Sequence, residues 1–134
     1  MTSNVESHNQ SGGVTAGVVV GGVARGMTDE EYGRFVDAGC ALESFRDTHR
    51  ERLMLAGMGI AGEAGEVCDL AKKTAFHGKV MELDKMVEEL GDTLWYFTLM
   101  TRLYGLTLDQ IREANVRKLC KRYPDMYGPA DIWV

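Results

Sequence analysis

The sequence predicts an all-α protein, and three features of its 134 residues lead to that class. Helix-capping patterns precede two apolar segments, with Thr28 and Glu31 at one and Thr107 and Gln110 at the other. The segments that follow repeat apolar residues at helical spacing. No strand-rich region competes with them. A chain of this length forms one domain with a single core.

Each expected helix has a recognisable beginning or end. The first begins after Met27 and ends at a break at residues 47–49, where Thr48 or His49 leads into the second. Gly78, Gly105 and Pro124 are placed to end the later helices. The second, third and fourth helices are expected at about 50–73, 81–104 and 107–122, and the tail that follows, 125–134, is expected to dock.

Residues 1–26 differ from the rest of the chain, because they are rich in glycine and valine and contain no lysine. We expect a flexible N-terminal arm there and a globular domain at 27–134. The arm lacks the basic start of a signal peptide, and glycines interrupt its apolar run. No stretch of the chain is apolar for long enough to predict a transmembrane helix.

Composition narrows the possible partners. The chain has 15 basic and 20 acidic residues, so its surface is not expected to bind nucleic acid. The three cysteines, Cys40, Cys68 and Cys120, lack CxxC spacing and are expected to be reduced core thiols in a cytoplasmic protein.

Two stretches suggest unusually close contacts. The second expected helix contains Gly57, Gly59, Gly62 and Gly65, each of which costs about 1 kcal/mol relative to alanine in a helix interior. Such a cost suggests close helix packing or a ligand that approaches the backbone. In the third, residues 94–100 are apolar on nearly every side, which predicts burial all round and therefore a dimer or larger assembly.

Two acidic pairs are the main functional signal. Glu63 and Glu66 lie on the second expected helix, and Glu89 and Asp92 lie on the third. Residues three apart share a helix face, so two facing helices would bring four carboxylates together. Such a group cannot stay fully ionised without a cation. Solvated helix faces are the simpler alternative, but the small and apolar neighbours of the acids argue against it.

The kind of ligand indicates the kind of metal. Oxygen ligands alone favour a hard cation, and Mg²⁺ suits a few carboxylates completed by water and phosphate. Di-iron bundles use Glu-x-x-His pairs, and neither His49 nor His77 follows a glutamate by three residues. Spacing leaves Glu88 as an alternative to Glu89, and it leaves Asp69 as either a fifth ligand or a helix-end acid.

Cationic residues follow the acidic pairs. Asn115, Lys118 and Arg122 share one face of the fourth expected helix and could hold phosphates by charge-assisted hydrogen bonds. Basic residues near a helix C-terminus also complement the helix dipole, which is the alternative explanation. The same question applies to the cationic groups near the end of the second helix, which are Lys72, Lys73, His77 and Lys79.

Together these motifs resemble the MazG-like all-α nucleoside triphosphate pyrophosphohydrolases over about residues 32–127. The motifs that carry the resemblance are residues 62–67, 76–79, 88–96, 115–118 and 121–124. The resemblance implies a four-helix bundle that assembles into homodimers or homotetramers. The N-terminal arm lies outside the family pattern, and Gly33 stands where relatives often carry glutamine.

The resemblance also implies roles for individual residues. Its Mg²⁺ ligands, with Mn²⁺ as a substitute, would be Glu63, Glu66, Glu89 and Asp92, which favours Glu89 over Glu88. Glu63 or Glu66 would orient or deprotonate the attacking water. The resemblance implies phosphate contacts from Lys118 and Arg122 and a base or sugar contact from Asn115. Lys73, among the cationic groups near the end of the second helix, is a further expected substrate-binding residue.

The expected reaction is Mg²⁺-dependent hydrolysis of a (deoxy)nucleoside triphosphate to the monophosphate and pyrophosphate. Some bacteriophage relatives convert dGTP to dGMP, so a purine dNTP is one candidate. The expected location is the cytoplasm of a bacterial cell, or the host cytoplasm if the protein is phage-encoded. Phe35, Phe45, Trp95 and Tyr96 could stack on a base, although such aromatics more often belong to a core. The alternatives are a nucleotide-binding regulatory or assembly module and a phosphoribosyl-ATP pyrophosphohydrolase.

Overall fold

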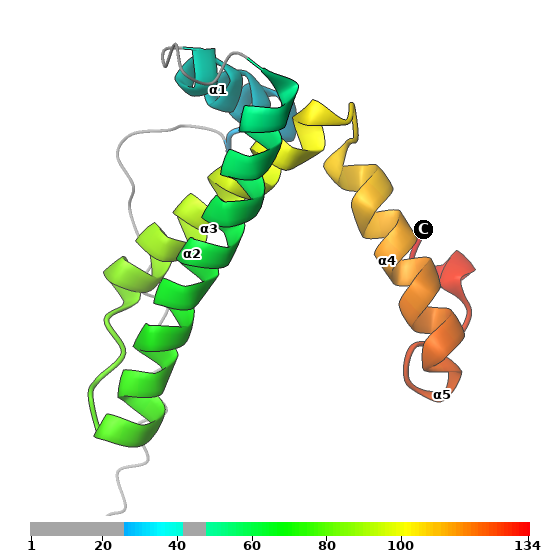
Figure 1. The fold of residues 1–134 in the computed structure, drawn as a ribbon. Coiled ribbons are helices and arrows are strands. Elements are labelled where there is room, and N and C mark those ends of the chain that lie inside the picture. Colours follow the sequence, from blue (N-terminus) through cyan, green and yellow to red (C-terminus); the bar gives the residue numbers. More distant parts are fainter. Residues whose placement is uncertain (1–25, 42–47) are drawn as a thin grey trace, which may run out of the picture.

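The structure is a computed structural model that describes residues 26–41 and 48–134 (Figure 1). All elements in this part of the chain are helical, which confirms the all-α prediction. All of the expected arm except Gly26 lies outside the described residues, as does Phe45. The elements are α1 (Asp29–Ala41), α2 (His49–His77), α3 (Leu83–Leu103), α4 (Leu108–Arg122), α5 (Pro124–Tyr127) and a 3-10 turn, η2 (Ala130–Ile132).

The helix ends follow the local signals in the sequence. At α1 and α4 the expected capping boxes form, with Thr28 Oγ1 accepting from the Glu31 N–H at 3.2 Å and Thr107 Oγ1 accepting from the Gln110 N–H at 3.1 Å. Thr48 caps α2 in the same way. Gly78 has a φ of 63°, a left-handed conformation that suits glycine and ends α2. The helix thus continues past residue 73 to His77, one turn further than expected.

Helices α2 and α3 lie side by side for most of their length (Figure 1). The connection between them is short, so the two helices are antiparallel. Helix α1 packs across one end of the pair, against α3. The core of this three-helix part consists of the buried residues Val36, Cys40, Ala56 and Leu99.

The α2/α3 pair therefore has two unlike halves. In the covered half, residues 53–60 and 95–103, the pair packs against α1, and Trp95 and Met100 contact the core. In the open half, residues 61–77 and 83–94, the outer face of α3 exposes large apolar side chains at successive helical turns. These are Leu83, Val87, Leu90 and Leu94, each more than 40% exposed.

Burial of the apolar segment 94–100 is only partial. Thr98 and Leu99 are buried, Leu94 is 43% exposed, and the rest are half-buried. The expectation for the cysteines holds at Cys40 and Cys120, which are buried free thiols, and is wrong at Cys68, which is exposed. Cys68 lies in the open half, where, among the helices of residues 26–41 and 48–134, α3 is the main neighbour of α2.

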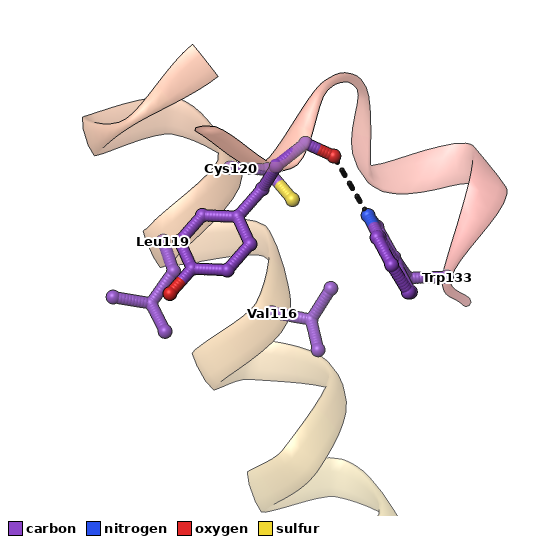
Figure 2. Close-up of a pocket in the computed structure, with 5 residues that line it drawn as sticks. Val116, Leu119, Cys120 and Trp133 are labelled. Carbon is purple, nitrogen blue, oxygen red and sulfur yellow. Dashed lines mark hydrogen bonds between the residues drawn. The ribbon is translucent and has the colours of Figure 1, made fainter. Parts of the chain in front are cut away.

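Helix α4 diverges from the α2/α3 pair (Figure 1). An ion pair of 2.9 Å between Arg112 and Asp29 links it to the start of α1. The expected docking of the tail is confirmed, because α5 and η2 fold back on α4. Figure 2 shows Trp133 opposite Val116 and Cys120 of α4, with its indole N–H donating to the Tyr127 carbonyl at 2.9 Å. No helix in the described ranges combines the length and apolarity needed to cross a membrane.

Candidate functional site

Three of the predicted metal ligands meet on the α2/α3 pair. Glu63 of α2 and Glu89 and Asp92 of α3 each offer a carboxylate oxygen, and these oxygens all lie within 4.8 Å of one another. Glu89 and Asp92 share a face of α3 because they are three residues apart. Glu63 and Glu89 are half-buried and Asp92 is exposed. We call these three residues the acid cluster; it lies where the open half meets the covered half.

The fourth predicted ligand, Glu66, lies close enough to Glu89 to affect its pKa. Partial desolvation raises the pKa of Glu89, and the negative charges of Glu66 and Glu63 raise it further, followed by those of Asp92 and Glu88. Glu66 is thus close enough to act on Glu89, although it is not among the three residues whose oxygens converge. Of the two alternatives left by spacing, the structure puts Glu89, not Glu88, in the acid cluster.

The acid cluster fits a hard divalent cation by the chemistry of its donors. It offers carboxylate oxygens and no nitrogen or sulfur, the donor set that Mg²⁺ and Mn²⁺ prefer. Mg²⁺ sites commonly use one or two protein carboxylates and fill the remaining positions with water and phosphate. A cation at this position would also relieve the repulsion that raises the Glu89 pKa.

Asp69 makes different contacts. Its carboxylate pairs with Lys72 and, at 2.6 Å, with Lys73. The hydrogen bond from Lys72, followed by that from Lys73, lowers the Asp69 pKa to about 2. Asp69 is therefore held by lysines and is not one of the converging acids. Lys73 is a predicted substrate-binding residue, and its pKa is raised mainly by the hydrogen bond to Asp69 and further by the negative charges of Glu66 and Glu82.

The predicted substrate residues of α4 lie apart from the acids. Asn115 and Lys118 line a shallow hollow on α4 together with Gln110. Arg122, at the end of α4, is exposed. Because α4 diverges from α2 and α3, the structure does not bring this row beside the acid cluster of the same chain (Figure 1). Within the described residues, the charges that perturb Glu89 all belong to carboxylates.

Tyr32 of α1 is a neighbour of the site that the motifs did not indicate. Burial raises the pKa of its hydroxyl, and the negative charge of Asp92 raises it further. The ring stacks with Phe35, with centroids 6.0 Å apart. The spacing of three between these aromatics was the available signal, since it puts both on one face of α1. Among the predicted base-stacking aromatics, Phe35 is 59% exposed, whereas Trp95 and Tyr96 pack between helices.

Comparison with known proteins supports the sequence resemblance. Over 76 residues the chain is 32% identical to the Gene 37 protein of Mycobacterium phage L5, a match that covers 54% of this chain and 67% of that protein. No solved structure matches the chain. Residues 52–127, which include the whole acid cluster, match the MazG nucleotide pyrophosphohydrolase domain. The chain therefore belongs to the MazG family of nucleotide pyrophosphohydrolases.

Proposed function

We propose that the chain hydrolyses a (deoxy)nucleoside triphosphate to the monophosphate and pyrophosphate, using Mg²⁺ or Mn²⁺. The observation that carries this proposal is the convergence of Glu63, Glu89 and Asp92 within 4.8 Å in a chain with a MazG domain. The catalytic domain would comprise residues 27–134, with residues 1–26 as an arm.

Glu63, Glu66, Glu89 and Asp92 would hold the metal. When bound, Mg²⁺ offsets triphosphate charge and lowers the pKa of a coordinated water. The carboxylate of Glu63 or Glu66 would orient the attacking water and accept its proton. Attack at the α-phosphorus breaks its bond to the α–β bridging oxygen, and that oxygen leaves with the pyrophosphate.

The proposed contacts with the substrate come from α4 and from Lys73 of α2. Lys118 and Arg122 would stabilise charge on the β- and γ-phosphates, with Asn115 at the base or sugar and Lys73 as a further phosphate contact. We infer a homodimer or homotetramer, because a second copy against the open half would cover the exposed apolar stripe of α3. The same assembly offers a route by which an α4 cation of one copy could approach the acids of another.

A purine dNTP such as dGTP is the substrate we propose to test first. The similarity to a mycobacteriophage protein supports a phage type of enzyme, which would act in the cytoplasm of a bacterial host. The experiment is a panel of ribo- and deoxynucleoside triphosphates, assayed for monophosphate and pyrophosphate with Mg²⁺ and again with a chelator. Phosphoribosyl-ATP belongs in the same panel.

The expected result is metal-dependent release of pyrophosphate that is greatest with a purine dNTP. The variants Glu66→Gln and Asp92→Asn should lose this activity and remain folded. A regulatory or assembly module would bind a nucleotide without releasing pyrophosphate under any of these conditions, and that outcome would overturn the proposal.

A further inference from the structure

Gly59 of α2 and Tyr96 of α3 make an unusually close contact. A Cβ atom built on Gly59 would lie within 3.0 Å of three atoms of the Tyr96 ring, a separation that real Cβ atoms essentially never show. The ring therefore rests directly on the α2 backbone. Because side chains at the contact set the distance between packed helices, this glycine permits the approach of α2 and α3 here.

The contact lies about one helical turn from two members of the acid cluster, Glu63 and Asp92. Glu63 follows Gly59 by four residues, and Asp92 precedes Tyr96 by four. In an antiparallel pair, these two offsets run in the same direction along the axis, so the contact lies about 6 Å along the axis from Glu63 and Asp92, and about 10.5 Å from Glu89. A change in helix separation at Gly59 would be transmitted to the acids, because both belong to the same continuous helices.

The short metal–oxygen distances of Mg²⁺ limit how far the two helices can separate while the acids still share one ion. Mg²⁺ lies about 2.1 Å from each ligand oxygen, so two oxygens on one ion are at most about 4.2 Å apart. The three carboxylate oxygens of the acid cluster already lie within 4.8 Å of one another. Side-chain rotation can close that small gap. Separation of the helices would enlarge it.

Tyr96 also has limited freedom to move aside. Its ring meets Trp95 edge-on, with centroids 5.1 Å apart and planes at 81°. Trp95 itself packs against the core and against Gly39 of α1, where an added Cβ would lie 3.4 Å from the indole. Displacing Tyr96 would therefore disturb the packing of all three helices.

We propose that Gly59 and Tyr96 are positioning residues, whose contact holds α2 and α3 at the separation that lets Glu63, Glu89 and Asp92 share one divalent cation. This inference rests on the proposed metal-binding function of those acids. Other glycines of α2 provide matched controls. A Cβ on Gly57 would make an ordinary contact of 3.8 Å with Met100, and one on Gly62 would meet no atom within 4 Å in the part of the chain that the structure describes.

The test compares Mn²⁺ affinity, measured from the electron paramagnetic resonance signal of free Mn²⁺, among glycine variants. Gly59→Ala is expected to weaken binding by roughly tenfold, as for other changes that misplace metal ligands. Gly57→Ala and Gly62→Ala gain the same helix propensity and are expected to bind as wild type. Adding Tyr96→Leu to Gly59→Ala should restore most of the affinity, with Tyr96→Leu alone as the reference.

A stability control separates positioning from general destabilisation. Val36 is fully buried in α1, so Val36→Ala should lower the unfolding temperature without the tenfold loss of Mn²⁺ affinity. Wild-type affinity in Gly59→Ala, or equal losses in Gly57→Ala and Gly59→Ala, would overturn the inference. If the wild-type protein binds Mn²⁺ but releases no pyrophosphate, the proposed reaction fails, and the affinity comparison still decides the role of Gly59.

Discussion

The covered and open halves of the α2/α3 pair differ in what fills the space around them. In the covered half, small residues of α2 pack against large side chains of α3, and α1 packs against the same part of the helix pair. In the open half, no atom of the described residues lies within 4 Å of a Cβ added to Gly62, Gly65 or Gly91. The acid cluster lies where the two halves meet. Close packing therefore supports the acids on one side, whereas on the other side the described residues leave these glycine positions uncovered.

The largest expected effect is loss of activity in Asp92→Asn. This change removes a carboxylate from the acid cluster at an exposed position, so pyrophosphate release should fall at least about 100-fold while the fold remains. Asp84→Asn, on an exposed turn of the open half, is the control and should retain activity. Wild-type turnover by Asp92→Asn would remove Asp92 from the proposed mechanism.

Stability should depend mainly on the covered half. Leu99 is 3% exposed, so Leu99→Ala should lower the free energy of unfolding by about 2–5 kcal/mol. Leu90 is 51% exposed, and at protein concentrations where the chain is monomeric Leu90→Ala should cost less than about 1 kcal/mol. Urea unfolding measures both. Equal losses would show that the two halves do not differ as described.

Assembly should depend mainly on the open half. Leu90→Glu puts a charge in the exposed apolar stripe of α3 and should shift the protein toward monomers in sedimentation velocity. Met126, at 72% exposed, lies on the C-terminal tail, so Met126→Glu should leave the assembly unchanged. The same sedimentation profile for wild type and Leu90→Glu would argue against the open half as the interface.

The smallest effect concerns Asp69, an ion-paired residue on the surface of the open half. Its pKa is lowered from 3.8 to about 2, so its ion pairs stabilise the fold above pH 3.8, and that stabilisation is lost as the pH falls through about 2. Carboxyl NMR should show titration near that lower value, and replacing Lys72 and Lys73 with alanine should raise the Asp69 pKa. Titration of wild-type Asp69 near 3.8 would contradict the pairing.

Local features of the fold were predictable, because they depend on residues close in sequence. The capping boxes at Thr28 and Thr107 and the left-handed Gly78 follow from short-range hydrogen bonds and steric limits. The convergence of Glu63 with Asp92 was also foreseeable, since spacing fixes the helix face of each acid and a short connection makes the helices antiparallel.

Longer-range features were not predictable from spacing. The glycines of α2 look alike in sequence, but only the structure separates Gly59, which packs under Tyr96, from Gly62, which is open. The proximity of Tyr32 to Asp92 depends on how α1 crosses α3. The direction of α4 depends on the turn at Gly105, which has a φ of 62°, and periodicity carries no information about that direction.

We propose that Glu63, Glu89 and Asp92, whose carboxylate oxygens converge, form one divalent-metal site at the boundary between the two halves. Anomalous diffraction from crystals grown with Mn²⁺ tests it most directly. We predict an anomalous peak between these three carboxylates that is lost in Asp92→Asn crystals. A well-ordered acid cluster without such a peak, in crystals whose Mn²⁺ is bound elsewhere, would show that these acids are not a metal site.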